Sequence, residues 1–187
     1  MGIAEKVTVK NTIIRALVGD ITAEKTEAIV NAANSSLMGG GGVDGAIHRA
    51  GGPAILDDCR KIVAEIGRLP AGKAAITTAG KMAAKYVIHT VGPVWHGGNA
   101  HEPDILASCY AECLKLASAR GIRSIAFPAI STGIYGYPAG LAAQVAVSTL
   151  TGFIRNANSS VEDVHFVLFD KASYNIYVAE LEKIAGK

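Results

Sequence analysis

The sequence predicts an α/β fold built on a mixed, mostly parallel central sheet. Short apolar runs typical of strands alternate along the chain with longer amphipathic segments typical of helices. Prolines stand where several helices are expected to begin, a position at which the missing N–H has no intrahelical partner to lose. Two early strand-like runs lie close together with Asn11 and Thr12 between them, so we expect a hairpin there and a mixed rather than purely parallel sheet.

Each expected element follows from this alternation. The expected strands are Val7–Val9, Ile13–Val18, Ala28–Ala32, Ala75–Thr78, Tyr86–Thr90, Ser124–Pro128 and Val164–Phe169. The expected helices are Val43–Ala50, Pro53–Ile66, Pro103–Arg120, Pro138–Asn156 and Ala172–Ala185. Pro53, Pro103 and Pro138 begin three of these helices. Gly121 follows Arg120 as a helix-ending glycine.

The composition indicates one globular domain covering residues 1–187. Half of the residues are hydrophobic and 18% are charged, unlike the composition of a disordered chain. The net charge of +2 argues against a broad surface for nucleic acid or membrane. No apolar run approaches the roughly 20 residues that span a bilayer.

The cysteines indicate a reducing compartment. Cys59, Cys109 and Cys113 form an odd number without framework spacing, so we expect a cytoplasmic protein. Cys109 and Cys113 lie four residues apart on an expected helix with His101 nearby, which leaves a metal site as an alternative. We expect no metal, because such a site needs more ligands and buried free cysteines on a helix face are common.

A run of four glycines, Gly39–Gly42, follows the expected strand Ala28–Ala32. Each glycine loses more backbone entropy on folding than any other residue, so four in succession need a reason. They let backbone N–H groups point at a ligand, and the helix that begins next adds the positive end of its dipole. We therefore expect a phosphate-binding loop rather than a flexible linker or a tight turn.

The same loop matches a dinucleotide-binding fingerprint by its letters alone. Gly40, Gly42 and Gly45 have the G-x-G-x-x-G spacing. That fingerprint requires a tight strand-to-helix turn and an acidic residue about 20 positions later, at the end of the next strand. Here about seven residues separate the strand from the glycines, and Glu65 falls inside a helical stretch. The loop is therefore not expected to be a Rossmann site.

Asp44 stands in the first turn of the helix that follows these glycines. The helix dipole keeps a carboxylate ionised there, and capping of the helix start is the simple explanation. A carboxylate in an anion-binding loop works against its ligand, which favours a functional role: orienting or deprotonating a water beside a bound phosphate-sugar. His48, one turn further on the same face, supports Asp44 in that interpretation, with a structural histidine as the equal alternative.

A second loop of this kind follows the expected strand Ser124–Pro128, and both loops stand where open sheets bind ligands, beyond the carboxyl ends of strands. Its residues are Ser131, Thr132, Gly133, Ile134, Tyr135 and Gly136. The hydroxyls and glycines suit a second phosphate, and Tyr135 suits a sugar. Ordinary strand-to-helix loops carry the same residue types as caps. Two such loops in one chain are more specific, because a diphosphate needs two walls.

Two further residues suit a base. Asp20 follows the expected strand Ile13–Val18 and either caps a helix, with Thr22 as an alternative cap, or accepts a hydrogen bond from an exocyclic amine such as that of adenine. Phe169 closes the last expected strand and either stacks on the base or packs in the core.

Together these segments resemble a macrodomain. The segments that carry the resemblance are Val18–Thr22, Ile29–Asn34, Gly39–His48, His89–Pro93 and Pro128–Gly136, in family order and over most of the chain. The stretch from Asn34 to His48 is similar to the MacroD-type branch of ADP-ribosyl hydrolases and O-acetyl-ADP-ribose deacetylases. The resemblance implies a three-layer α/β/α sandwich with ADP-ribose in a cleft over the strand ends.

The resemblance also implies roles for individual residues. Asp20 takes the adenine amine, with Ile21 beside it and Phe169 near the ring. Asn34 contacts the distal ribose, and Asp44 is the catalytic aspartate. The residues expected to hold the diphosphate and the adjoining ribose are Gly41, Gly42, Val43, Ser131, Thr132, Gly133, Ile134 and Tyr135.

The implied activity is hydrolysis of an ester on the distal ribose, without metal or cofactor. The implied substrates are O-acetyl-ADP-ribose and proteins mono-ADP-ribosylated on aspartate or glutamate, with Asn34 positioning the ribose and Asp44 activating a water. A non-catalytic ADP-ribose reader and a phosphatase acting on ADP-ribose 1″-phosphate use the same cleft and stay open as alternatives. The joint presence of Asn34 and Asp44 favours the enzyme.

Overall fold

The computed structural model describes residues 5–186 and is built around a seven-stranded sheet. The strands are β1 (Lys6–Val9), β2 (Thr12–Val18), β3 (Ala28–Ala32), β4 (Ala74–Thr78), β5 (Tyr86–Thr90), β6 (Ser124–Phe127) and β7 (Asp163–Leu168). Their order across the sheet is β1-β2-β7-β6-β3-β5-β4. The five inner strands are parallel, and β1 and β4 are antiparallel edge strands. The predicted mixed, mostly parallel sheet is confirmed.

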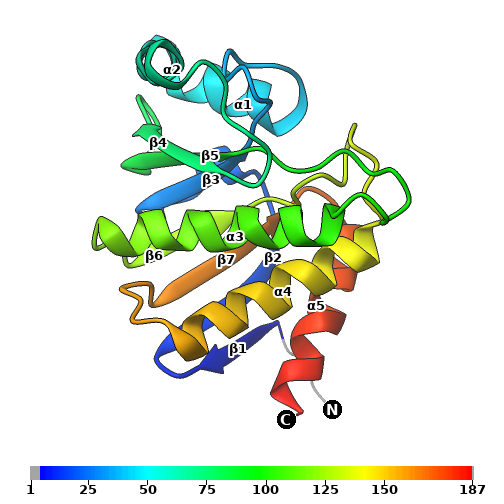
Figure 1. Cartoon of the computed structure of the whole chain (residues 1–187). Coiled ribbons are helices and arrows are strands. Elements are labelled where there is room, and N and C mark those ends of the chain that lie inside the picture. The colour runs from blue at the N-terminus through cyan, green and yellow to red at the C-terminus, as the bar shows by residue number, and fades with distance from the viewer. Residues whose placement is uncertain (1–4, 187) are drawn as a thin grey trace.

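Helices cover both faces of this sheet. Figure 1 shows α3 and α4 crossing in front of one face. The helices are α1 (Gly42–Gly51), α2 (Pro53–Ile66), α3 (Glu102–Ala119), α4 (Ala139–Asn156) and α5 (Lys171–Ala185), with a short 3-10 turn, η1 (Ile21–Ala23). Helices α3, α4 and α5 pack on one face, and α1 and α2 on the other. The expected three-layer α/β/α sandwich is confirmed. None of the helices within residues 5–186 is long and apolar enough to cross a membrane.

Two apolar clusters lie on opposite faces of the sheet. Ile29 in β3 and Val87 in β5 belong to the smaller cluster under α1 and α2, whereas their neighbours Val30 and Ile88 belong to the larger cluster under α3, α4 and α5. Successive side chains of a strand point to opposite faces, so strands covered on both sides are apolar at most positions. This arrangement explains why the inner strands appear in the sequence as continuous apolar runs.

The structure corrects the sequence analysis at three positions. The first hairpin turns at Lys10, which has a φ of 51°, and Asn11; Thr12 already belongs to β2. Pro138 is the residue before α4 rather than its first residue. Phe169 lies outside β7 and is 90% exposed, so the alternative of core packing is wrong. The other expected elements have ends within one residue of those observed.

A shallow groove of about 400 Å³ lies where the segment after η1 passes β6 and β7. Within its lining, His165 Nδ1 is 2.7 Å from Glu24 and His165 Nε2 is 3.1 Å from Asp163. Burial opposes a charge on this imidazole, but the contacts with Glu24 and Asp163 outweigh it and raise the pKa of His165. Arg15 binds the other oxygen of Asp163 at 2.9 Å, so the groove is lined by an ion-pair network rather than by glycine-loop residues.

This network predicts a pH-dependent contribution to stability. Because the folded pKa of His165 is above its unfolded value, its contribution is fully present below the unfolded pKa and is lost as pH rises through the folded one. We expect the melting temperature of a His165→Gln variant to lie further below that of the wild type at about pH 5.5 than at about pH 8. Thermal unfolding of both proteins at both pH values checks this, and an equal difference at the two pH values would contradict it.

Candidate active site

The two glycine-rich loops leave the sheet side by side. The first connects β3 to α1 and the second connects β6 to α4, and β3 and β6 are adjacent parallel strands in which Ile29 pairs with Ala126. Their carboxyl ends therefore lie at the same edge of the sheet, as does the end of β2 before Asp20 and the end of β7 before Phe169. The residues that the sequence analysis singled out thus border one edge.

The first loop and the start of α1 contain two glycines, Gly42 and Gly45, that other residues replace only with strain. A Cβ added to Gly45 would lie 2.5 Å from the carbonyl oxygen of Gly40, because α1 packs directly against the loop. Gly42 has a φ of 56°, a left-handed conformation that favours glycine. Apart from the adjoining residues and the backbone of α1 itself, no described atom lies within 4 Å of a Cβ built on Gly41 or Gly42. The start of α1 therefore opens onto free space, where the unpaired N–H groups of a first helical turn attract an anion.

Asp44 lies in the first turn of α1 and is only 5% exposed. Its Oδ1 accepts a hydrogen bond of 2.8 Å from the side-chain amide of Asn31 in β3. Its Oδ2 faces the opposite way, since a Cβ on Gly40 would lie 3.2 Å from it. The simple capping explanation for Asp44 is wrong, because Gly41 is the N-cap residue and the carboxylate bonds to Asn31 instead.

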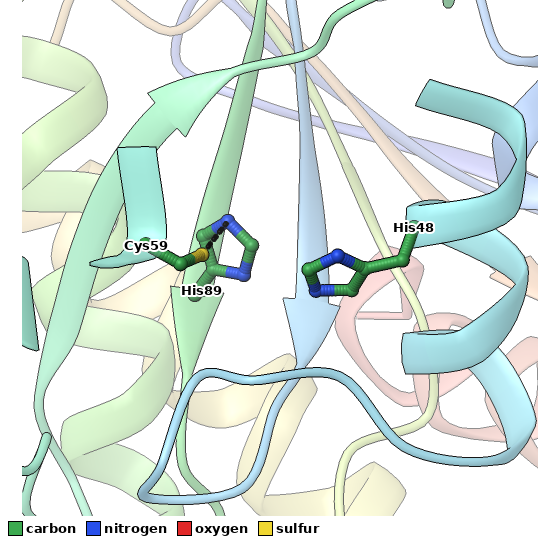
Figure 2. Close-up of side chains that lie close together, drawn as sticks. All are labelled: His48, Cys59 and His89. Atoms are coloured by element: carbon green, nitrogen blue, oxygen red, sulfur yellow. Dashed lines mark hydrogen bonds between the residues drawn. The ribbon is translucent and has the colours of Figure 1, made fainter. Parts of the chain in front are cut away.

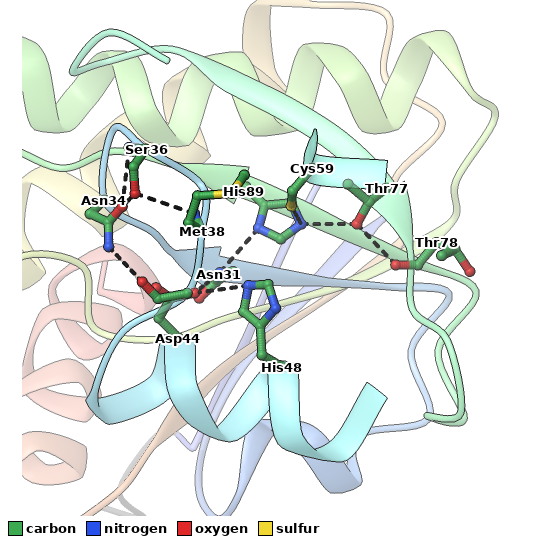
Figure 3. Close-up of polar contacts among 11 residues, drawn as sticks. Asn31, Asn34, Ser36, Met38, Asp44, His48, Cys59, Thr77, Thr78 and His89 are labelled. Atoms are coloured by element: carbon green, nitrogen blue, oxygen red, sulfur yellow. Dashed lines mark hydrogen bonds and ion pairs between the residues drawn. The ribbon is translucent and has the colours of Figure 1, made fainter. Parts of the chain in front are cut away.

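Asn34 lies on the same side of the loop as Asp44 Oδ2. Its Nδ2 donates to the carbonyl oxygen of Gly39 at 2.9 Å and would lie 3.4 Å from a Cβ on Gly40. Its Oδ1 accepts from the backbone N–H of Ser36 at 3.1 Å and from the Ser36 hydroxyl. The asparagine is therefore held in a fixed orientation beside the loop (Figure 3), with Gly40 between it and the carboxylate.

His48 stands one helical turn after Asp44, as expected. Its Nε2 is 3.4 Å from Asp44 Oδ1, an ion pair when the imidazole is protonated, but it makes no hydrogen bond within residues 5–186. Oδ1 thus faces two side chains of the protein interior, and Oδ2 faces the loop. This arrangement leaves one oxygen of the carboxylate for chemistry at the loop.

The sequence analysis did not assign roles to three buried polar residues behind Asp44. Asn31 and His89 pair in register across β3 and β5 and are both fully buried, and Thr77 in β4 is 4% exposed. Hydrogen bonds of about 3 Å join Asn31 Nδ2 to His89 Nδ1 and His89 Nε2 to Thr77 Oγ1 (Figure 3). The available signal was a polar residue inside each of two apolar strands, because such a residue needs a partner.

His89 also has a thiol and a second imidazole beside it. Figure 2 shows Cys59 and His48 approaching the ring from opposite sides, and ligand atoms of the three residues lie within 4.8 Å of one another. Both nitrogens of His89 already have hydrogen-bond partners. Burial, with Asp44 and Asp58 nearby, also raises the pKa of the Cys59 thiol to about 11, which disfavours the thiolate that a metal binds. The hydrogen-bonded arrangement therefore explains the cluster without a metal.

The metal alternative of the sequence analysis involved different residues. Cys109 and Cys113 are fully buried in the larger apolar cluster, and the side chain of His101 is 84% exposed at the start of α3. Cys109 donates to the carbonyl oxygen of Val91 at 3.2 Å. The two cysteines thus behave as small apolar residues of a helix face, and His101 does not join them.

The second loop, between β6 and α4, differs from the prediction in the orientation of one side chain. Ser131 has a φ of 66°, and its hydroxyl is buried against Gly92 without a hydrogen-bond partner in the described part of the chain. We predicted that this hydroxyl would face a phosphate, but in the structure it faces inward. Ile134 is 94% exposed, and Tyr135 is partly exposed and accepts a backbone hydrogen bond of 2.8 Å from Trp95. The tip of the loop, rather than Ser131, thus faces outward.

At the far end of the edge, Asp20 and Phe169 follow the adjacent strands β2 and β7. Asp20 is the N-cap of η1, and its Oδ1 accepts from both the N–H and the hydroxyl of Thr22. Asp20 rather than Thr22 is therefore the cap, as the first alternative proposed. Ile21 is buried in the smaller apolar cluster, so η1 is anchored to the core beside an exposed aromatic ring.

A comparison with known families decides the identity of the fold. The family model of the Macro domain matches residues 30–146. The chain belongs to the macrodomain family. The O-acetyl-ADP-ribose deacetylase of Salmonella gallinarum is 56% identical over 164 residues, which cover 88% of this macrodomain and 91% of the relative.

Solved macrodomains superpose closely on this one. A mutant of the Oceanobacillus iheyensis macrodomain with ADPR has a TM-score of 0.92 at 40% identity, covering 97% of this chain and 98% of that one. A Trypanosoma brucei macrodomain in complex with ADP-ribose has a TM-score of 0.81 at 38% identity, covering 89% and 68%.

Solved mutants of the Oceanobacillus protein replace an asparagine, a glycine and an aspartate that lie seven and three residues apart in its sequence. Asn34, Gly41 and Asp44 have the same spacing in the present macrodomain. The three residue types thus recur at matching intervals in the two proteins.

Proposed function

We propose that this macrodomain binds ADP-ribose and hydrolyses the acetyl ester of O-acetyl-ADP-ribose. The observation that carries the proposal is the position of Asp44: its Oδ1 is held by Asn31, and its Oδ2 faces Gly40 and Asn34 at the loop. A carboxylate fixed in this way orients a water and accepts its proton. The relative that is 56% identical is an O-acetyl-ADP-ribose deacetylase, which agrees with this chemistry.

We place the diphosphate between the two loops. The N–H groups at the start of α1, from Gly41 to Val43, and the loop from Ser131 to Tyr135 would surround it. Asn34 would contact the distal ribose, since its amide is fixed on the side of Asp44 Oδ2. This placement brings an ester on that ribose next to the carboxylate.

The hydrolysis then needs only a water and these side chains. Asp44 Oδ2 accepts a proton from the water as the water oxygen attacks the carbonyl carbon of the acetyl group. The bond between that carbon and the ribose oxygen breaks, and the ribose oxygen takes up the proton that Asp44 accepted, which restores the carboxylate. The products are ADP-ribose and acetic acid, which ionises to acetate. The same bond type joins ADP-ribose to aspartate or glutamate side chains, so mono-ADP-ribosylated proteins are proposed as further substrates.

The adenine would lie at the other end, between Asp20 and Phe169. Both described hydrogen bonds of the Asp20 side chain are accepted by Oδ1, which leaves Oδ2 for the exocyclic amine. The Phe169 ring, 90% exposed, offers a face for stacking. The three free, buried cysteines fit a reducing compartment, and we propose the cytoplasm as the location.

Loss of the aromatic ring tests this end of the site. We expect Phe169→Ala to raise the Kd for ADP-ribose about three- to tenfold, the range typical of one aromatic contact, with a melting temperature within about 1 °C of wild type. Ile66→Ala is a suitable control, because Ile66 is an exposed apolar residue at the end of α2. Calorimetric titration with ADP-ribose measures both variants. An unchanged Kd for Phe169→Ala would remove this residue from the site.

The function itself is tested in two steps on one preparation. Calorimetric titration with ADP-ribose comes first, followed by an assay of acetate release from O-acetyl-ADP-ribose in the presence of a chelator. Binding with acetate release supports the enzyme. Binding without release would instead favour the reader, and release of inorganic phosphate from ADP-ribose 1″-phosphate would favour the phosphatase. Failure to bind ADP-ribose at high micromolar concentration would overturn the proposal.

A further inference from the structure

A chain of buried hydrogen bonds runs from Asp44 into the sheet. It passes through Asn31 in β3, His89 in β5 and Thr77 in β4, and it ends at the backbone carbonyl of Thr78. The three side chains are at least 96% buried among apolar neighbours. Leaving a polar group unpaired in such surroundings costs free energy, so the hydrogen bonds between neighbours constrain the orientation of each side chain.

The donor and acceptor at each step follow from chemistry. A carboxylate only accepts, so Asn31 must present its amide nitrogen, Nδ2, to Asp44 Oδ1 at 2.8 Å. The same nitrogen lies 3.0 Å from His89 Nδ1, which must then be the unprotonated acceptor. The ring proton is therefore on Nε2, which donates to Thr77 Oγ1 at 2.9 Å. The Thr77 hydroxyl in turn donates to the carbonyl of Thr78 at 2.9 Å.

His89 keeps this single neutral form at physiological pH. Burial, together with the neighbouring His48, lowers the pKa of His89 to about 3. The single proton of the neutral ring is thus on either Nδ1 or Nε2, and the hydrogen-bond partners of the ring decide which nitrogen carries it.

The other tautomer would disturb Asp44. A proton on His89 Nδ1 would face the amide nitrogen of Asn31, so that two hydrogen-bond donors would oppose each other. The Asn31 amide would then turn and present Oδ1 to His89. That oxygen would then also face Asp44 Oδ1. Within residues 5–186, Asn31 Oδ1 is buried and has no hydrogen-bond partner that would hold the amide in its present orientation. The two contacts of Nδ2 alone hold it.

We propose that Thr77, His89 and Asn31 are positioning residues for the Asp44 carboxylate. Thr77 selects the Nε2–H tautomer of His89, His89 orients the amide of Asn31, and Asn31 holds Asp44 with Oδ2 toward the loop. The inference rests on the proposed ester hydrolysis, because it assigns these residues to the orientation of its base.

Thr77, the residue of this hydrogen-bonded series that is farthest from Asp44, gives the sharpest test. Thr77→Val keeps the shape of the side chain and removes only the hydroxyl, whereas Thr77→Ser keeps the hydroxyl. We expect kcat for acetate release to fall about tenfold in Thr77→Val with the Kd for ADP-ribose within about twofold, and Thr77→Ser to restore kcat to within about twofold of wild type. Thr151→Val is the matched control, because it removes a buried hydroxyl that donates to the carbonyl of Val147 in α4. Its kcat should equal that of wild type.

A second measurement reads the tautomer directly. Nitrogen-15 NMR of the histidine rings should show the proton of His89 on Nε2 in the wild type and in Thr77→Ser, and a population with the proton on Nδ1 in Thr77→Val. A wild-type ring with the proton on Nδ1 would overturn the inference. A Thr77→Val variant with wild-type kcat would also overturn it. Equal loss of kcat in both Thr77 variants without a change of tautomer would overturn it as well, because it would show that Thr77 acts through packing.

The two proposals fail in different ways. If the wild type binds ADP-ribose but releases no acetate, the proposed hydrolysis is wrong, and the NMR experiment still decides whether Thr77 sets the tautomer of His89. If acetate is released and the tautomer is as expected but indifferent to Thr77, only the positioning role is wrong.

Discussion

Replacing Asp44 by asparagine is expected to slow acetate release from O-acetyl-ADP-ribose by about 10²–10⁴-fold, the usual effect of removing a general base. The amide keeps the shape of the carboxylate, and its oxygen accepts the bond that Asn31 now donates to Oδ1. The variant loses the charge and the base that face Gly40. ADP-ribose should bind within about threefold of wild type or more tightly, because a negative charge beside the diphosphate is removed.

The measurement separates kcat from binding. Acetate release gives kcat and KM, and calorimetric titration of ADP-ribose gives the Kd. Asp57→Asn is the matched control, since it makes the same chemical change on the exposed face of α2, where Asp57 pairs with Arg60. Unchanged acetate release by the Asp44 variant would remove Asp44 from the mechanism, and loss of both binding and turnover would show that its role is structural.

Gly45→Ala is expected to weaken ADP-ribose binding about ten- to hundredfold and to lower the melting temperature by several degrees. The added Cβ would lie 2.5 Å from the Gly40 carbonyl oxygen and 3.0 Å from the Arg49 guanidinium. A Cβ atom and a backbone carbonyl oxygen cannot approach each other that closely, so α1 and the loop must separate. Gly40 lies beside Asp44 Oδ2 and Asn34, and the shift therefore displaces the whole ribose end of the site.

The same substitution four residues earlier provides the control. Gly41 has an extended backbone with a φ of −94°, and no described atom outside the adjoining residues lies within 4 Å of its added Cβ. Gly41→Ala should therefore fold with a melting temperature within about 2 °C of wild type. Calorimetry and thermal unfolding of both variants check this. If the two variants melt together, the contact between Gly40 and Gly45 does not determine the shape of the loop.

The architecture was largely predictable because its signals are local. Apolar runs, helix-starting prolines such as Pro53 and a helix-ending glycine at Gly121 depend on neighbouring residues only, and the structure confirms them. The order of the strands was not predictable in this way, because the pairing of β3 with β6 joins Ile29 to Ala126, nearly a hundred residues apart. The resemblance to macrodomains supplied the layers that periodicity alone did not.

Residues of the proposed site were picked out from the sequence where they accompany a glycine-rich loop, and residues buried in strands were missed. Asn34 and Asp44 stood out because they accompany glycines at a helix start. Asn31 and His89 were visible as polar residues in apolar strands, but their partnership depends on the register of β3 against β5. The inward hydroxyl of Ser131 depends on the close approach of Gly92, which lies in a different connection of the sheet.

The division of the interior into two apolar clusters also divides the cysteines. Cys59 belongs to the cluster beneath α1 and α2, next to the site, whereas Cys109 and Cys113 belong to the cluster on the other face. All three are free and buried, so none reacts until its own cluster opens. Since layers of a protein open with different free energies, the rate at which each thiol is labelled distinguishes loosening around the site from unfolding of the whole chain. The sequence thus provides one cysteine that reports on the cluster beside the site and two that report on the cluster on the other face.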